Sequence, residues 1–257
     1  MAYPLPNASI DLTGQIALVT GASSGLGRRF AKVLARQGAK VAITGRRLDR
    51  LEALAAEIAA DGGTAAALQL DVTDTDQLLS LFDRAEAALG PVDILVNNAG
   101  IPDAQRATKM SIELIDNVLG TNVRAPWILA TEFAKRRLEA KRPGRIINIA
   151  SMAAYSYRGE GAALYSVSKA AVVRMTEALA VEWSKFHINV NAIAPGAFAS
   201  EMMDGMLERM GDISQHMPRR RIGDPAQLDS TLLYLCSPAS DAVTGTSIKV
   251  DDGQGGR

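Results

Sequence analysis

One tyrosine in the chain stands at a helical spacing from a lysine. The chain has five tyrosines, and only Tyr165 is followed four positions later by a lysine, Lys169. On a helix, this spacing puts both side chains on one face. A nearby ammonium group lowers the pKa of a phenol, so Tyr165 is a candidate for exchanging a proton with a carbonyl or alcohol oxygen near neutral pH. The alternative is a surface pair on an ordinary helix.

A hydroxyl group stands upstream of this pair. Ser151 directly follows the apolar run 145–150, which has the pattern of a buried strand. A serine at the end of such a strand could hydrogen-bond the same substrate oxygen as the phenol. The alternative is that Ser151 only shapes the turn at the end of the strand.

The glycine-rich stretch TGASSGLG lies between an apolar strand expected at 16–20 and a helix expected at 28–37. Glycines in this place let the backbone turn tightly and approach a diphosphate, and the helix presents its N-terminal amides to that anion. The spacing is GxxxGxG rather than the common GxGxxG, and a purely structural turn is the alternative. The residues assigned here to a dinucleotide cofactor are Gly21, Ser23, Ser24, Gly25, Leu26 and Gly27.

The second expected strand ends in Thr44-Gly45-Arg46-Arg47. NAD-binding sites commonly place an acidic residue here to hold the ribose hydroxyls, and in this chain the position is Gly45. Arg46 and Arg47 instead offer guanidinium groups to a 2′-phosphate. The pattern predicts NADP(H) as the preferred cofactor over NAD(H), the alternative being that both arginines are a solvated helix start.

Short apolar runs alternate with longer helical stretches along the whole chain. The strand runs lack polar alternation, which is typical of parallel strands covered on both faces. We therefore expect an α/β fold with helices on both faces of a parallel sheet. No linker or repeat interrupts the pattern, so residues 1–257 are predicted to form one domain. Strands are expected at 16–20, 40–44, 64–70, 93–97, 145–150, 188–193 and 247–250, and helices at 28–37, 48–60, 74–89, 112–139, 162–184 and 225–235.

Composition excludes several classes of protein. Lys plus Arg and Asp plus Glu both number 28, so the net charge of zero argues against a general nucleic-acid binder. No run of 18 apolar residues exists, and the N-terminus has no secretory-signal pattern, so no membrane association is expected. The single cysteine, Cys236, fits a reducing compartment. Together these features predict a cytoplasmic protein.

The order and spacing of these stretches resemble the short-chain dehydrogenase/reductase family, from Leu12 to Gly253. Besides the glycine-rich turn, the resemblance rests on NNAG at 97–100, Asn122, Ser151, Tyr165 to Lys169, and Pro195-Gly196. It implies a Rossmann-type, doubly wound parallel sheet of about seven strands and a nicotinamide cofactor. The most similar members are those that resemble 3-oxoacyl-carrier-protein reductases.

The resemblance also implies roles for four catalytic residues. Tyr165 would be the general acid in reduction and the base in oxidation. Lys169 would hold the nicotinamide ribose and lower the pKa of Tyr165, and Ser151 would orient the substrate oxygen. Asn122 would kink the long helix and hold a water that relays protons to Lys169. Helix packing is the alternative for Asn122.

Further cofactor contacts follow from the same resemblance. Asp71 and Val72 match positions beside the adenine, the alternative for Asp71 being a helix cap or turn. Asn98, Ala99 and Gly100 would support the cofactor and the central strand. Pro195 and Gly196 would begin the loop over the nicotinamide. Ser200 stands where the family often has a threonine that bonds the carboxamide.

We expect an oxidoreductase that interconverts a ketone and a secondary alcohol. Specificity should lie in 153–161, which includes Arg158, and in the irregular, Met-rich segment 198–223. A 3-oxoacyl-thioester reductase, on carrier protein or CoA, is the alternative. It is disfavoured by Val181, which replaces the basic residue expected to dock the acidic carrier. A non-catalytic, NADP-sensing regulatory or scaffold protein is the alternative from another class.

The expected partners are a small-molecule substrate and further copies of the chain. The long helices at 112–139 and 162–184 carry apolar residues beyond one stripe, and family resemblance suggests that they pair in a homotetramer or homodimer. No metal is expected. Asp251 and Asp252 near the C-terminus could hold a cation, but a solvated turn is the preferred interpretation.

Overall fold

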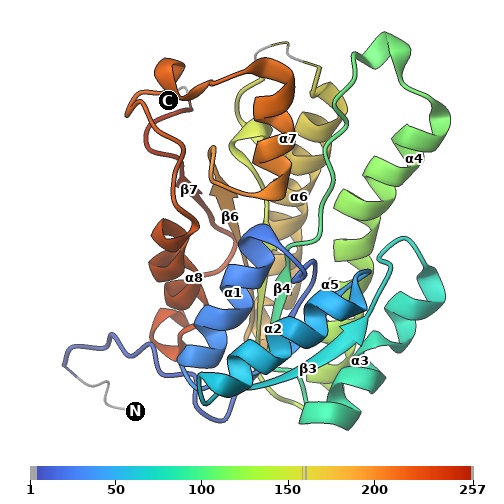
Figure 1. The fold of residues 1–257 in the computed structure, drawn as a ribbon. Helices are drawn as coiled ribbons and strands as arrows, with labels where there is room; N and C mark the ends of the chain where they lie inside the picture. Colours follow the sequence, from blue (N-terminus) through green and yellow to red (C-terminus); the bar gives the residue numbers. More distant parts are fainter. Residues whose placement is uncertain (1–4, 158, 160, 256–257) are drawn as a thin grey trace.

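Seven parallel strands form one sheet in the order β3-β2-β1-β4-β5-β6-β7 (Figure 1). The computed structural model describes residues 5–157, 159 and 161–255. The sheet takes strands from both halves of the chain. The strands are β1 (Ile16–Val19), β2 (Lys40–Gly45), β3 (Thr64–Gln69), β4 (Ile94–Asn97), β5 (Gly144–Ile149), β6 (Ile188–Pro195) and β7 (Ser247–Val250).

Helices cover both faces of the sheet, as the sequence predicts. One face packs against α1 (Gly25–Arg36), α2 (Leu48–Ala60) and α8 (Asp229–Cys236). The other packs against α3 (Thr75–Leu89), α5 (Ala125–Glu139) and α6 (Ala163–Trp183). The described residues contain no helix with both the length and the hydropathy that a bilayer crossing requires.

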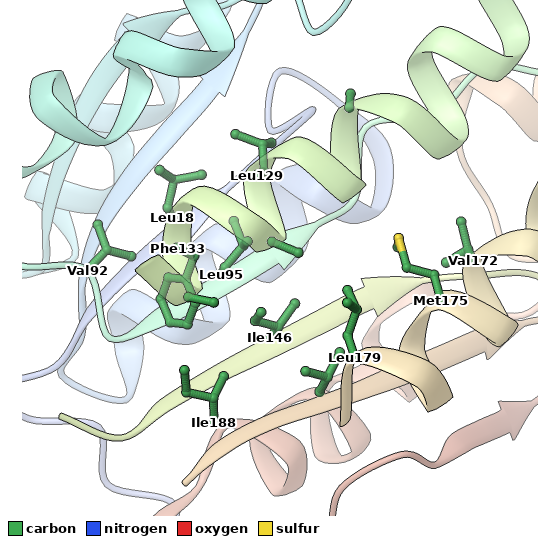
Figure 2. Packing of buried hydrophobic residues seen from close by; sticks show 14 of the residues in the cluster. Leu18, Val92, Leu95, Leu129, Phe133, Ile146, Val172, Met175, Leu179 and Ile188 are labelled. Carbon is green, nitrogen blue, oxygen red and sulfur yellow. The ribbon is translucent and has the colours of Figure 1, made fainter. Parts of the chain in front are cut away.

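The strands are apolar throughout because both of their faces are buried. Figure 2 shows Leu18, Leu95 and Ile146 of three neighbouring strands packed together with Phe133 of α5 and Leu179 of α6. All five side chains are buried almost completely. Burying a side chain of this size contributes roughly 1.5–3 kcal/mol, so this layer holds β1, β4 and β5 firmly under the helices.

The long helix expected at 112–139 is interrupted. It consists of α4 (Ile112–Leu119), a π-helical stretch (Gly120–Arg124) and α5, and Pro126 is the second residue of α5. The irregularity therefore precedes Pro126. Because a proline lacks an N–H group, it is tolerated in a first helical turn, and the break lies at Asn122 instead.

The segment 198–223 is more ordered than expected. It contains α7 (Glu201–Met210) and a short 3-10 helix (Ser214–His216), and a bridge joins its two ends at Phe198 and Gly223. In Figure 1, α7 lies above α1. The helix expected at 225–235 begins as a 3-10 turn (Pro225–Leu228) before α8.

Candidate active site

The strand order reverses on either side of β1, and the glycine-rich turn follows this strand. Thr20 Oγ1 accepts hydrogen bonds from the N–H groups of Asn98 and Ala99, both at 3.0 Å. The side chain of Asn98 donates in return to the carbonyl oxygens of Thr20 (2.9 Å) and Gly21 (3.2 Å). The turns after β1 and β4 therefore hold each other at the edge where ligands bind in such sheets.

Glycine is required at two positions of this turn. Gly21 has a φ of +66°, and a Cβ there would lie 2.9 Å from the Cα of Ala99. A Cβ on Gly27 would overlap the carbonyl oxygen of Gly21 and the side-chain nitrogen of Asn98. The glycines thus let α1 begin close to the turn, with Leu26 packed on the core.

The N-terminal end of α1 has the properties of an anion site. Ser24 precedes the helix, but its side chain makes no capping hydrogen bond, and the first turn holds no acidic residue. Ser23 and Ser24 instead accept hydrogen bonds from Arg47 Nη2, at 3.0 and 2.8 Å. Free helix amides beside a guanidinium and two hydroxyls suit phosphate oxygens, so these residues fit a dinucleotide cofactor.

The two arginines after β2 differ in their surroundings. Arg46 is exposed, and its carbonyl oxygen accepts a hydrogen bond from Gln69. Arg47 is half-buried and also pairs with Glu201, the first residue of α7, at 3.0 Å. Glu201 could not be predicted from the sequence, because no local pattern links it to Arg47.

The catalytic candidates on α6 meet the end of β5. Lys169 is buried, and its Nζ donates to the carbonyl oxygen of Ile149 at 2.8 Å. The same Nζ lies 5.6 Å from the centroid of the Tyr165 ring. Burial lowers the pKa of Lys169 to about 8. Since that value lies above 7, the side chain remains mainly a cation at neutral pH.

The pKa of Tyr165 shifts in the direction opposite to the one predicted. Burial raises it, a side-chain hydrogen bond with Ser151 lowers it, and the negative charge of Asp103 raises it. Desolvation of the phenolate therefore outweighs the other effects, and Tyr165 is a neutral phenol at neutral pH. The bond with Ser151 does bring together two residues that the sequence places fourteen positions apart.

Asp103 is a second residue that the sequence analysis missed. It is buried, and its Oδ2 accepts a hydrogen bond from the backbone N–H of Tyr165 at 3.0 Å. This N–H belongs to the first turn of α6, where the helix itself supplies no acceptor. Asp103 therefore holds the segment that carries the phenol, by a contact between residues 62 positions apart.

Asn122 lies in the π-helical stretch and is buried. Its Oδ1 accepts from the N–H of Ile101 at 2.9 Å, while its Nδ2 donates to the Ile101 carbonyl and to Ser168 Oγ, both at 3.0 Å. Gly100 lies beside it, and a Cβ there would be 3.4 Å from both Asn122 Oδ1 and Lys169 Nζ. The structure thus brings Asn122 close to the lysine.

The remaining cofactor candidates lie at strand ends. Asp71 Oδ1 accepts from the N–H and hydroxyl of Thr73, at 2.9 and 2.8 Å, which is the turn considered as its alternative. Val72 packs against the core. Pro195 ends β6, and the N–H of Gly196 donates to the carbonyl of Val250 at 2.9 Å.

Ser200 has a local role that the sequence analysis did not foresee. Its Oγ accepts from the N–H of Met203 at 3.2 Å and so caps α7. Capping by serine is worth about 1 kcal/mol, and it fixes where α7 starts. Ser200 also lies against the glycine-rich turn, since a Cβ added to Gly25 would lie 3.3 Å from the Cβ of Ser200.

The C-terminal acidic pair forms a turn. Asp251 is buried and accepts from the N–H groups of Gly253 (3.1 Å) and Gly255 (2.9 Å). Asp252 pairs with Arg221 at 2.7 Å. Across the part of the chain that the structure describes, no cluster of His, Cys, Asp and Glu could hold a metal ion. Arg158, predicted to influence specificity, lies outside the described residues.

Comparisons with known proteins place these features in context. A family model described as short chain dehydrogenase matches residues 15–211. Gluconate 5-dehydrogenase of Gluconobacter oxydans (strain 621H) is 36% identical over 246 residues, covering 95% of both chains. The 3-oxoacyl-[acyl-carrier-protein] reductase of Synechocystis (strain PCC 6803) is also 36% identical, covering 94% of this chain and 97% of its own.

A solved structure has nearly the same fold. The crystal structure of a variant of actinorhodin polyketide ketoreductase with NADPH matches with a TM-score of 0.90. The two sequences are 32% identical, and the match covers 95% of this chain and 98% of the other. This chain therefore shares its overall fold with a protein that was crystallised with NADPH.

Proposed function

Because the chain belongs to the short-chain dehydrogenase family, an oxidoreductase family, we propose that it interconverts a ketone and a secondary alcohol with NADP(H). The observation that carries the proposal is the convergence of Tyr165, Ser151 and Lys169 at the end of β5. A neutral phenol hydrogen-bonded to a serine is suited to donate a proton to a carbonyl oxygen. The bound cofactor would supply or accept the hydride.

Residues of the chain itself would position the substrate, transfer the proton and hold the cofactor. Ser151 would hold the substrate oxygen beside the Tyr165 hydroxyl, which donates its proton in reduction and accepts one in oxidation. Lys169, fixed by the Ile149 carbonyl, would place a positive charge near the phenol and hold the nicotinamide ribose. Asn122 would keep the backbone after β4 in position and hold the water that relays protons to Lys169.

The proposed cofactor site surrounds the glycine-rich turn. Gly21 to Gly27 and the amides of α1 would hold the diphosphate, and Arg46 and Arg47 the 2′-phosphate. Asp71 and Val72 would lie at the adenine, Asn98 to Gly100 would support the site, and Pro195, Gly196 and Ser200 would lie at the nicotinamide. The preference for NADP(H) is supported by Arg47 at the turn and by the related ketoreductase crystallised with NADPH.

Reduction of 3-oxoacyl thioesters is the second candidate, supported by the Synechocystis relative. Docking of an acidic carrier would need basic residues near the end of α6. Val181 occupies the expected position and is 79% exposed, so it presents an apolar side chain there. We therefore favour a free ketone or alcohol, and the gluconate dehydrogenase relative makes polyhydroxylated acids the first class to test.

A substrate screen distinguishes these functions. Consumption of NADPH and of NADH would be measured with 5-dehydrogluconate, simple ketones and diketones, and acetoacetyl-CoA. Turnover of a free ketone with NADPH supports the proposal, whereas turnover of the thioester alone supports the second candidate. Cofactor binding without any turnover would favour the non-catalytic, NADP-sensing alternative.

We also propose a homotetramer or homodimer in the cytoplasm. Large apolar side chains remain exposed on α4, α5 and α6 of the single chain, as is usual for a surface that another subunit covers. They include Ile112 (73% exposed), Trp127 (47%) and Val167 (61%). Analytical ultracentrifugation of the purified protein would test the assembly, and a monomer at micromolar concentration would contradict it.

A further inference from the structure

The first residue of α7 forms an ionic bridge to the corner between β2 and α2. Glu201 Oε2 lies 3.0 Å from Arg47 Nη2, and Glu201 Oε1 lies 2.5 Å from Arg50 Nη1. The hydrogen bonds with Arg47, Ser24 and Arg50 and the charge of Arg47 lower the pKa of Glu201 to about 2. The carboxylate is therefore negatively charged throughout the physiological pH range.

The bridge uses the donors of Arg47 that face the glycine-rich turn. Nη2 donates to Ser23, Ser24 and Glu201, Nη1 donates to Glu201 at 3.4 Å, and Nε donates to Ser23 at 3.3 Å. Every nitrogen of this guanidinium thus has an acceptor within the protein. A phosphate that accepts from two nitrogens of Arg47 in the paired manner must therefore take the place of Glu201 on the Nη1–Nη2 edge or of Ser23 on the Nε–Nη2 edge.

The bridge also holds one end of α7 against this turn. Ser200, next to Glu201 in the chain, caps α7 and lies beside Gly25. The carboxylate therefore links α7, the arginine of the proposed 2′-phosphate site and the proposed diphosphate turn. With Glu201 53% and Arg47 39% exposed, the pair adds little to overall stability, so its consequences are local.

We propose that Glu201 competes with the 2′-phosphate of NADP(H) for Arg47 and thereby sets how strongly the protein discriminates NADP(H) from NAD(H). The inference rests on the proposed NADP(H) dependence. A carboxylate and a phosphate both accept from a guanidinium in the same paired manner, so only one of them can occupy the Nη1–Nη2 edge of Arg47 at a time. NAD(H) lacks the 2′-phosphate and does not displace Glu201 from Arg47.

Cofactor fragments test the competition without any turnover. Isothermal titration calorimetry would measure the Kd of adenosine 2′,5′-bisphosphate and of 5′-AMP for the wild type and for Glu201→Gln. Removing the competing charge should tighten bisphosphate binding about three- to tenfold and change 5′-AMP binding by less than twofold. The matched control is Glu208→Gln, which makes the same change at an exposed position on α7 and should leave both Kd values as in the wild type.

Arg47→Met completes the design. It should weaken bisphosphate binding and abolish the gain from Glu201→Gln in the double variant. If the wild type binds the bisphosphate more tightly than 5′-AMP and Glu201→Gln leaves this preference unchanged or reduces it, the proposed competition is wrong. The proposed cofactor preference then still stands. If neither protein prefers the bisphosphate, both fail. A preference that emerges only in Glu201→Gln supports the competition and shows that the native enzyme is not selective for NADP(H).

Discussion

Asn122 and Ile101 exchange two hydrogen bonds between side chain and backbone. The N–H of Ile101 donates to Asn122 Oδ1 at 2.9 Å, and Asn122 Nδ2 donates to the Ile101 carbonyl at 3.0 Å. The side-chain amide thus pairs with backbone groups of the segment that follows β4, as a neighbouring strand would do. Its Nδ2 also reaches Ser168 on α6, so one buried side chain joins three segments around Lys169.

Asn122→Ala should destabilise the fold by about 2–3 kcal/mol. The change leaves the N–H and carbonyl of the half-buried Ile101 without these partners, and an unsatisfied group costs about 1–3 kcal/mol when it is shielded from water. Urea denaturation followed by circular dichroism measures the free energy of unfolding. The control is Asn117→Ala on α4, an exposed position where alanine has the higher helix propensity and where only one long hydrogen bond, from Thr121 Oγ1 at 3.4 Å, is lost. Equal stabilities for the two variants would contradict the importance of the Asn122 bonds.

Tyr165→Phe should reduce turnover by about two to four orders of magnitude, the usual contribution of a general acid. Binding of adenosine 2′,5′-bisphosphate should be unchanged, since the lost hydroxyl bonds Ser151 and not the proposed phosphate site. Steady-state kinetics on the ketone found by the screen, with calorimetry, separates the two effects. Tyr234→Phe alters an exposed tyrosine on α8 and should be fully active. Comparable activity in both variants would refute the assignment of Tyr165.

Tyr165 should stay neutral in alkaline solution when no cofactor is present. Burial and the charge of Asp103 raise its pKa above the ordinary value of 10.0, and the Ser151 bond only partly offsets them. The ultraviolet phenolate absorbance of the wild type minus that of Tyr165→Phe isolates this one group. No difference should develop below pH 10, and a midpoint near neutrality would instead restore the expectation drawn from the sequence.

Lys169 should make stability depend on pH. Its pKa is about 8 in the folded protein and 10.5 as a free group. Between these values the unfolded chain binds more protons than the folded one, so the free energy of unfolding rises as the pH increases. Below about pH 8, Lys169 is charged in the folded protein, and the full free-energy cost of burying this cation applies. The lowering of its pKa from 10.5 to about 8 corresponds to about 3 kcal/mol.

The comparison with Lys169→Met isolates this effect, because methionine is similar in length and does not titrate. The variant should be more stable than the wild type at pH 7, and the gap should shrink by about 2–3 kcal/mol as the pH approaches 10. Urea denaturation across this range provides the measurement, with Lys185→Met reporting the loss of an exposed lysine. A gap that does not change with pH would contradict the lowered pKa.

Most of the fold could be predicted because its signals are local. The apolar run at 16–20 contains β1 and extends one residue beyond it, the run at 188–193 lies within β6, and the helix expected at 162–184 is α6 to within a residue at each end. The helix expected at 112–139 is interrupted at Asn122, where the family resemblance implied a kink that helical periodicity alone did not predict. Its π-helical stretch coincides with side-chain bonds from Asn122 to Ile101 and Ser168, and helical periodicity carries no information about such distant partners.

The sequence by itself determined the strand–helix alternation, the glycine turn and the candidates Ser151, Tyr165 and Lys169, because chain spacing and residue type define them. Only the tertiary structure decided that Asp103 holds the Tyr165 backbone and that Glu201 pairs with Arg47, 154 positions away in the chain. The surroundings of Tyr165 in the folded protein also raise its pKa, whereas the sequence predicted a lowered value. Desolvation and long-range charge depend on what surrounds a group in space, and spacing along a chain does not contain that information.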